Sequence, residues 1–221
     1  GLADWSYTRI ECTGEDLARI VGEAGPEFRG FSVTMPAKFA ALEFADEVTE
    51  RARAIGSANT LVRIDPEKLE AGWRADNTDC EGLLAALDEL TRGEPIRSAV
   101  VVGAGGTARP ALWALAQLGV ERIHVLNRSD RAAELADLTE GIDVTFSTFD
   151  TDIAAATVAA DVVVSTVPSQ AIEAYVNDLA HAPVLDVIYD PWPTPLSVRA
   201  ASHGYNTVGG LVMLAAQSYS Q

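Results

Sequence analysis

A strand that runs into a glycine-rich turn constrains the fold of this chain more than any other feature. Residues 99–108 hold a Val-rich run and then Gly-x-Gly-Gly-x-Ala, and an Ala- and Leu-rich stretch follows them. Gly103 allows the tight turn, and Gly105 lets the backbone approach a pyrophosphate. The helix N-terminus that follows supplies N–H donors to phosphate. The residues expected to bind the phosphate-bearing ligand are Gly103, Ala104, Gly105, Gly106, Thr107 and Ala108.

The second half of the chain alternates short β-branched runs with helical stretches. Strands are expected at 98–103, 122–127, 143–146, 161–166 and 183–188. Helices are expected at 107–118, 130–138, 150–159 and 169–180. Continuous Val and Ile runs separated by single helices indicate a parallel sheet covered on both faces. Right-handed crossovers then give a doubly wound, Rossmann-like sheet.

The first half is less regular, and its pattern predicts a separate α/β unit. Strands are expected at 5–11, 30–34, 57–63 and 69–74. Helices are expected at 15–23, from Pro36 onward and at 78–90. Residues 91–95 read as a linker, so we expect two α/β domains that join near residue 92.

Charge and composition exclude several classes of function. Sixteen Lys and Arg against 32 Asp and Glu give a net charge of −16, which disfavours binding to nucleic acid or to an anionic membrane. Two cysteines suit a reducing compartment, no apolar run is long enough to span a bilayer, and no signal peptide is visible, so a cytoplasmic site is expected. The three histidines and two cysteines lack metal-ligand spacing, so no metal is expected.

The end of the strand after the glycine loop favours NADP as the cofactor. Asn127, Arg128 and Ser129 stand where an NAD site would carry Asp or Glu for the ribose hydroxyls. A guanidinium can instead pair with a 2′-phosphate, and Ser129 adds a hydroxyl donor. Methyltransferases use a similar glycine loop, but S-adenosylmethionine sites usually carry an acid at this point. The nearby Asp130 keeps the alternative open.

Lys38 is one of only two lysines among sixteen basic residues. It lies at the start of a helix, where a positive charge opposes the macrodipole, so helix propensity does not explain it. Asn59 places a polar amide inside an apolar strand, and Asp79 follows a polar turn. Asp79 fits either a helix cap or a catalytic role, and the sequence alone does not separate the two.

Several motifs, in order along nearly the whole chain, resemble those of the shikimate dehydrogenase family. They are 32–38 (Ser-Val-Thr-Met-Pro-x-Lys), 55–60, 77–79, the glycine loop, 127–129, 165–168, 186–191, and 210–214 with Gln217. The resemblance implies NADPH-dependent, reversible reduction of 3-dehydroshikimate to shikimate, in the biosynthesis of chorismate and the aromatic amino acids. Hydride delivery to a ketone leaves an alkoxide that needs a proton or a cation, and a lysine supplies either.

The resemblance also assigns roles and domains. The catalytic pair is Lys38 and Asp79. The substrate contacts are Thr34, Asn59, Tyr189 and Gln217. Further cofactor contacts are Arg131, Thr166, Val167, Gly210 and Met213. A substrate-binding domain is expected at 1–91, a Rossmann NADP-binding domain at 92–207, and a helix that returns to the first domain at 208–221.

Two other functions fit parts of this pattern. A quinate or quinate/shikimate dehydrogenase shares the motifs, although Arg128 argues against the members that prefer NAD. A non-catalytic NADP-binding regulatory module would keep the fold but would need neither Lys38 nor Asp79. The expected partner is the small-molecule substrate, with the chain a monomer or a homodimer. The family has an opening strand and a Ser-x-Ser turn before the segment that matches residues 1–5, so we expect a longer parent protein.

Overall fold

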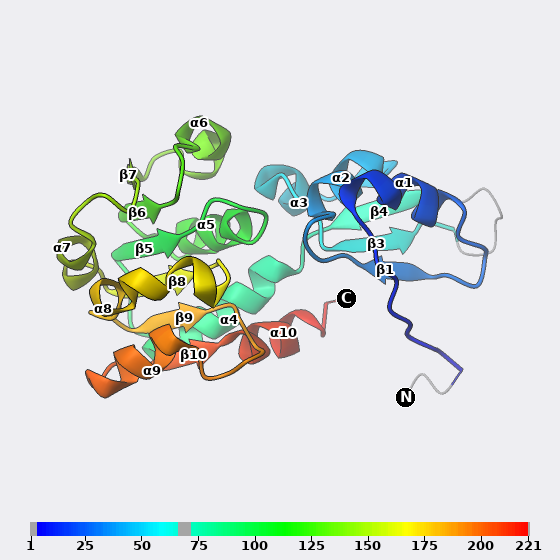
Figure 1. Cartoon of the computed structure of the whole chain (residues 1–221). Helices are drawn as coiled ribbons and strands as arrows, with labels where there is room; N and C mark the ends of the chain where they lie inside the picture. The colour runs from blue at the N-terminus through cyan, green and yellow to red at the C-terminus, as the bar shows by residue number, and fades with distance from the viewer. Residues whose placement is uncertain (1–3, 66–71, 221) are drawn as a thin grey trace.

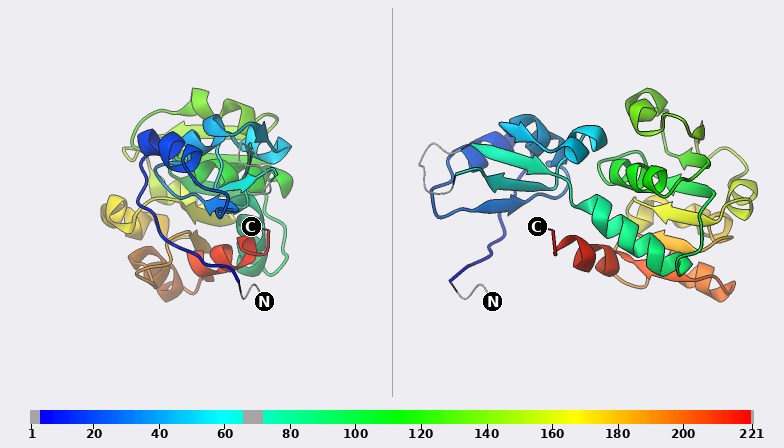
Figure 2. Two further views of the ribbon diagram at one scale, coloured as in Figure 1. Left: turned by 90° about the vertical axis from the view of Figure 1, so that its right-hand side faces the viewer. Right: turned by 180° about the vertical axis from the view of Figure 1, so that it is seen from behind.

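The computed structural model describes residues 4–65 and 72–220 and contains two α/β lobes (Figure 1). One lobe holds a four-stranded sheet, and the other holds a six-stranded sheet. The view from behind shows the long helix α4 (Asp79–Thr91) and the C-terminal helix α10 (Gly210–Gln217) side by side between the lobes (Figure 2). Segments from both lobes therefore meet around the start of α4.

The first lobe has the strand order β1-β3-β4-β2. Its strands are β1 (Gly30–Ser32), β2 (Glu47–Val48), β3 (Thr60–Arg63) and β4 (Trp73–Asp76). Its helices are α1 (Gly14–Gly22), α2 (Lys38–Phe44) and α3 (Glu50–Ile55). The pairs β1–β3 and β3–β4 are antiparallel, whereas β2–β4 is parallel. Leu17, Val21 and Ala41 of the helices pack with Leu61 and Trp73 of the sheet.

The second lobe is a parallel sheet with the order β10-β9-β8-β5-β6-β7. Its strands are β5 (Ser98–Val102), β6 (Arg122–Leu126), β7 (Asp143–Ser147), β8 (Val162–Ser165), β9 (Val184–Asp186) and β10 (Thr207–Gly209). Its other helical segments are α5 (Ala108–Gln117), α6 (Ala132–Leu135), η1 (Ala136–Leu138), α7 (Ile153–Val158), η2 (Ser169–Ala171), η3 (Glu173–Tyr175), α8 (Val176–Leu179) and α9 (Pro195–Ser202).

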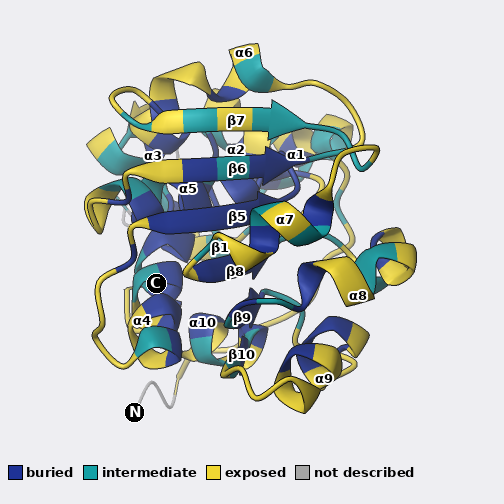
Figure 3. Ribbon diagram, turned by 90° about the vertical axis from the view of Figure 1, so that its left-hand side faces the viewer, coloured by how far each residue is buried: buried dark blue, intermediate teal, exposed yellow. Residues whose placement is uncertain are grey.

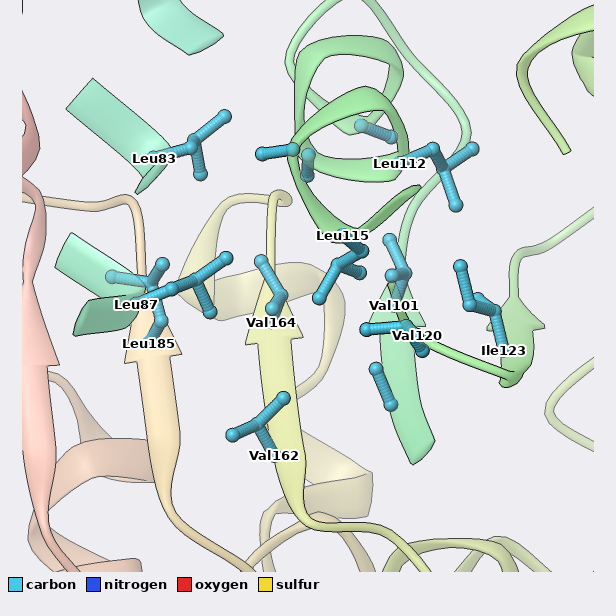
Figure 4. Close-up of a cluster of buried hydrophobic side chains, with 14 of the residues drawn as sticks. Leu83, Leu87, Val101, Leu112, Leu115, Val120, Ile123, Val162, Val164 and Leu185 are labelled. Atoms are coloured by element: carbon cyan, nitrogen blue, oxygen red, sulfur yellow. The ribbon is translucent and has the colours of Figure 1, made fainter. Parts of the chain in front are cut away.

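Helices cover both faces of this sheet, which confirms the predicted doubly wound architecture. Val101 points into the core shared with α4 and α5, whereas Val100 and Val102 point into the core shared with α7, α8 and α9. The alternation follows from the two-residue period of a strand. Figure 4 shows Leu83 and Leu87 of α4 among the side chains of the first of these cores. Figure 3 shows β5 buried along its whole length and β7 partly exposed at the edge.

Three local predictions are wrong. Residues 5–11 form no strand, because no strand pairs with them in the described part of the chain, and all seven residues are exposed to solvent. The helix predicted at 169–180 is broken into η2, η3 and α8, and Pro168 starts its first turn. The helix predicted from Pro36 begins two residues later, at Lys38. The first three residues of the strand predicted at 69–74 lie outside the described residues, and its end lies in β4.

The side chains of α4 pack mainly on the second lobe. Leu83, Ala86, Leu87 and Leu90 join the core that contains Val101. The helix ends at Arg92, which adopts a left-handed conformation, and Gly93 follows with φ +78°. This turn lies within the predicted linker at 91–95, whereas the assignment of 1–91 and 92–207 as domains stays a prediction.

Candidate active site

Lys38 and Asp79 form a buried ion pair. The Lys38 ammonium donates to Oδ2 of Asp79, and the two residues are 6% and 2% exposed. Lys38 is the first residue of α2, and Asp79 is the first residue of α4, 41 positions later. Because removing ions from water is costly, a pair this buried needs close partners for both charges.

Asn59 supplies the second partner of the Asp79 carboxylate. Its Nδ2 donates to Asp79 Oδ1 at 2.9 Å and to Thr78 Oγ1 at 3.0 Å, while its Oδ1 accepts from the Thr78 amide at 2.9 Å. Both oxygens of Asp79 therefore accept from side chains, and Thr78 is the N-cap residue of α4. Asp79 is therefore not the cap of α4, since its carboxylate bonds to Lys38 and Asn59, and its catalytic role stays a prediction.

A second amide, Asn77, fixes the backbone around the pair. Its Nδ2 donates to the Ser57 carbonyl at 2.8 Å, and its Oδ1 accepts from the Asp79 amide at 3.2 Å. The amide of Ala58 donates to the Lys38 carbonyl at 3.0 Å. The start of α2, the 57–59 segment and the start of α4 are therefore linked by short hydrogen bonds.

The neighbouring thiol of Cys80 takes no part in this network of charges. Its Sγ donates to the Asn77 carbonyl at 3.1 Å, and burial raises its pKa to about 11. A thiol with so high a pKa stays protonated at neutral pH and is a poor nucleophile.

The glycine loop of the second lobe lies directly against Lys38. A side chain at Gly106 would meet Met35 Sδ at 3.0 Å and Lys38 Cδ at 3.7 Å. Gly103 has φ +109°, and a side chain there would meet Thr166 Oγ1 at 2.5 Å and Val167 Cγ1 at 2.8 Å. The glycine loop and the predicted cofactor residues Thr166 and Val167, which follow β8, are therefore in contact.

Gly105 faces open space, which leaves room for a ligand above the loop. No heavy atom lies within 4 Å of the position that its side chain would take. Helix α5 begins directly after the loop, with Thr107 as its N-cap residue and the fully buried Ala108 as its first residue. The N–H groups at the start of a helix lack partners within the helix, so this turn offers donors beside the loop. The loop therefore fits the phosphate-bearing part of a dinucleotide.

A cavity of about 290 Å³ opens at the ends of β6 and β7, beside the loop. Its lining consists of Ala104, Val125, Asn127, Ser129, Asp130, Arg131, Phe146, Ser147, Thr148 and Thr151. Asn127 Nδ2 donates to the Ser129 carbonyl at 2.9 Å, and Arg131 pairs with Glu134 at 2.9 Å. Arg128 is exposed and does not line the cavity, and none of the described hydrogen bonds or ion pairs involves its side chain. Amide and hydroxyl groups, the Arg131 cation and the Asp130 carboxylate thus line this space.

Gln217 is the last residue of α10, the helix that packs along α4. The residue is 8% exposed, and its Oε1 has no hydrogen-bond partner within the described residues. On the same helix, the backbone and side chain of Met213 pack against Gly82 of α4, where a side chain would come within 2.5 Å of the Met213 carbonyl. Gly210 is packed even more closely on the Val187 carbonyl. A buried carbonyl oxygen without a donor is costly unless a ligand supplies one.

The side chains of two predicted substrate residues make no described hydrogen bond to this cluster. Thr34 is exposed and lines a separate cavity of about 470 Å³ between residues 6–21 and 28–37. Tyr189 is 54% exposed, and no described hydrogen bond connects it to Lys38 or Asp79. Their contact with substrate stays a prediction.

The structure adds Asn77, Arg109 and the hydroxyls of Ser147 and Thr151 to the residues around the site. Asn127 N donates to the Ser147 carbonyl at 3.1 Å, so the parallel register of β6 and β7 brings Ser147 beside the loop. The strand order of the folded sheet reveals this pairing, in which a single crossover joins the two parallel strands. Arg109 gave no signal in the sequence, because an arginine in the first turn of a predicted helix is not unusual.

Comparison with known proteins agrees with this geometry. Residues 2–61 match the model of the shikimate dehydrogenase substrate binding domain, and residues 92–183 match that of shikimate / quinate 5-dehydrogenase. A shikimate dehydrogenase (NADP(+)) of Rhizobium meliloti is 38% identical over 96% of this chain and 76% of its own length. The chain belongs to the shikimate dehydrogenase family.

Solved structures support the same membership. The crystal structure of Mycobacterium tuberculosis shikimate dehydrogenase superimposes with a TM-score of 0.87 at 48% identity, covering 100% of this chain and 81% of that one. Quinate dehydrogenase from Corynebacterium glutamicum, solved with NAD, gives a TM-score of 0.76 at 28% identity, covering 93% and 75%. The second of these shows that this family fold also occurs in a quinate dehydrogenase.

No helix in 4–65 or 72–220 combines the length and apolar character that crossing a membrane requires. Over the same residues, no three His, Cys, Asp or Glu side chains are grouped so that they could hold a metal ion.

Proposed function

We propose that Lys38 and Asp79 assist proton transfer in the reversible reduction of 3-dehydroshikimate to shikimate, the NADP-dependent reaction of the family to which this chain belongs. The observation that carries the proposal is the buried Lys38–Asp79 pair in contact with the glycine loop at Gly106. A sensor that only binds NADP would gain nothing from a buried ion pair at this position.

Lys38 holds the proton that the reaction needs. NADPH supplies the hydride, and the ketone oxygen gains negative charge as it is reduced. The ammonium of Lys38 stabilises that charge and donates its proton to the oxygen. In the reverse direction, the neutral amine takes the proton of the substrate hydroxyl.

Asp79 and Asn59 keep Lys38 aimed at that oxygen. Asp79 restrains the ammonium by a charge-assisted hydrogen bond, and Asn59 holds the other carboxylate oxygen at 2.9 Å. Because these three side chains are 2–6% exposed, little water competes for the proton. The entropic cost of ordering these side chains is therefore met when the protein folds, so substrate binding does not have to meet it.

Substrate hydroxyl and carboxylate groups are assigned to Thr34, Asn59, Tyr189 and Gln217. Gln217 has the clearest support, because its buried Oε1 needs a donor and shikimate offers three hydroxyl groups. Thr34 and Tyr189 are exposed side chains on loops, so a bound substrate could recruit them at small cost.

NADP is assigned to the loop and to the cavity beside it. Gly103 to Ala108 would hold the pyrophosphate, and Thr166, Val167, Gly210 and Met213 would flank the nicotinamide. Asn127, Ser129 and Arg131 line the cavity assigned to the ribose phosphate, and Arg128 is exposed next to Ser129 in the sequence. A bound 2′-phosphate could recruit both guanidinium groups, which favours NADP over NAD.

The domain and cellular assignments follow the same proposal. Residues 1–91 bind substrate, 92–207 bind NADP, and the helix within 208–221 returns Gln217 to the substrate side. The protein works in the cytoplasm on a small molecule, as a monomer or a homodimer.

The test is oxidation of shikimate by NADP, measured by NADPH absorbance on the protein expressed with its natural termini. We expect turnover with shikimate and NADP, and much slower turnover with NAD or with quinate. Faster turnover of quinate with NAD would replace the proposal with a quinate dehydrogenase. Tight NADPH binding without turnover of either substrate would indicate the regulatory module instead.

A further inference from the structure

The second residue of α5, Arg109, connects three elements across the two lobes. Its Nε donates to the Ile55 carbonyl at 2.5 Å, at the end of α3 in the first lobe. Its Nη1 donates to the Glu134 carbonyl at 2.8 Å, on α6 in the second lobe. The guanidinium thus joins the start of α5, which follows the glycine loop, to the substrate lobe.

Arg109 makes these contacts at an electrostatic cost. Burial lowers its pKa, although the charges of Glu134 and Asp137 act in the opposite direction, and no ion pair among the described residues includes it. Its hydrogen bonds go to neutral carbonyls, and the one at the end of α3 carries the partial negative charge of a helix C-terminus. Because the half-buried guanidinium bonds to carbonyls and not to a carboxylate, we infer that its role depends on where it is held.

Gly56 is shaped around the guanidinium. It adopts φ +72°, and a side chain there would lie 2.5 Å from Nη2 and 3.1 Å from Cζ of Arg109. Glycine is therefore required twice at this residue, once by the left-handed turn that ends α3 and once by the approach of Arg109.

The turn that Arg109 grips also leads to the catalytic pair. Ser57 Oγ donates to the Gly106 carbonyl at 3.4 Å, and the Ser57 carbonyl accepts from Asn77, which in turn accepts from the Asp79 amide. A shift of residues 55–57 against the loop would therefore change the separation between Lys38 and a nicotinamide on that loop.

We propose that Arg109 is a positioning residue, which locks the 55–57 turn of the substrate lobe onto the glycine loop and so fixes the distance over which hydride is transferred. The inference rests on the proposed function. Because misplacement by about 1 Å can cost two orders of magnitude in rate, one guanidinium can have a large effect without touching either ligand.

The central variant is Arg109→Met, which keeps the length of the side chain and removes the hydrogen bonds. We expect kcat to fall by roughly tenfold or more, while KM for shikimate and Kd for NADPH change by less than about threefold. The kinetic isotope effect with NADPH deuterated at the transferred position should rise, because hydride transfer becomes slower than product release. Arg199→Met, at an exposed arginine of α9, is the matched control and should leave these values unchanged.

Amide hydrogen exchange gives a readout that does not depend on turnover. Exchange at residues 50–58 should be faster in Arg109→Met than in the wild type or in Arg199→Met, at equal temperature and with NADPH absent. Thermal unfolding confirms that each variant is folded, and Arg109→Lys replaces Arg109→Met if the latter is not.

A double-mutant cycle of Arg109→Met with Gly56→Ala separates two effects of the added methyl group, its clash with the Arg109 guanidinium and the backbone strain at φ +72°. The cost of Gly56→Ala in kcat should be smaller in the Arg109→Met background, because the added methyl no longer meets a guanidinium. Unchanged kcat, isotope effect and exchange in Arg109→Met would overturn the inference and leave the proposed function standing. Absence of shikimate turnover in the wild type would overturn both.

Discussion

The two halves of the site are built in opposite ways. On the substrate side, Lys38, Asp79 and Asn59 are 2–6% exposed and bonded to one another. On the cofactor side, Arg131 is exposed and lines an open cavity, where its described ion pair is with Glu134, and Arg128 is exposed outside the lining.

This difference separates the residues that act in the reaction from those that recognise a ligand. A buried network is ordered by folding, so its loss should appear in kcat and in the stability of the protein. Exposed cations are screened by solvent and gain their partner only when the ligand arrives, so their loss should appear in Kd. Each substitution below tests one side of this division.

The largest effect is expected for Asp79→Asn. The substitution keeps the shape of the side chain but leaves the buried Lys38 without a counter-charge, so we expect kcat to fall by about 10²- to 10⁴-fold. The free energy of unfolding should fall by about 3 to 5 kcal/mol, the usual cost of breaking a buried pair. Steady-state kinetics and urea unfolding measure the two effects. Glu89→Gln, at an exposed position of the same helix, is the control and should match the wild type.

A smaller loss is expected for Asn59→Ala. Removing the amide leaves Asp79 Oδ1 and the Thr78 amide without their partners, which should lower the free energy of unfolding by about 1 to 3 kcal/mol. The value of kcat should fall less than in Asp79→Asn, because the ion pair itself remains. Equal kcat in Asn59→Ala and the wild type would show that the network does not aim Lys38.

On the cofactor side, Arg128→Ser should weaken NADPH binding by roughly tenfold, the value of one charge-assisted contact at an exposed site. Binding of NADH, which lacks the 2′-phosphate, should change little, and kcat at saturating NADPH should stay near the wild-type value. Fluorescence titration of both cofactors measures the effect. An equal loss for NADPH and NADH would remove Arg128 from 2′-phosphate recognition.

The smallest effect is expected at His124 in β6. Its Nε2 is hydrogen-bonded to Ser147 Oγ, and burial lowers its pKa below the ordinary 6.5. The unfolded chain therefore binds a proton before the folded protein does, and stability is lost as pH falls below about 6.5, by at most ~1.4 kcal/mol per pKa unit. Thermal unfolding at pH 7.5 and 5.5 should show a smaller acid loss for His124→Asn than for the wild type or His181→Asn. An identical loss in all three proteins would exclude His124 as a source.

The sequence predicted the second lobe well because its strands carry their own signal. The Val run of β5 is apolar at every residue since both faces of the strand are covered, and the adjacent glycine loop marks its end. The strand predicted at 5–11 failed because alternation alone does not make a strand when no neighbour supplies the hydrogen bonds.

Single site residues could be predicted only where the residue type was unusual for its predicted helix or strand. Lys38 and Asn59 stood out as a rare lysine at a helix start and an amide in an apolar strand, and the structure brings both to Asp79. Arg109 gave no such signal, because arginine is common in helices and its partners are backbone carbonyls. Contacts to backbone depend on how the two lobes meet, and local sequence patterns do not contain that information.

The central claim is that Lys38 provides the proton while the glycine loop holds NADP independently of it. The most direct measurement is shikimate oxidation by Lys38→Met, with NADPH affinity titrated on the same preparation. We predict a loss of kcat of about 10²- to 10⁴-fold with NADPH affinity within about threefold of the wild type. Undiminished turnover in Lys38→Met would contradict the account.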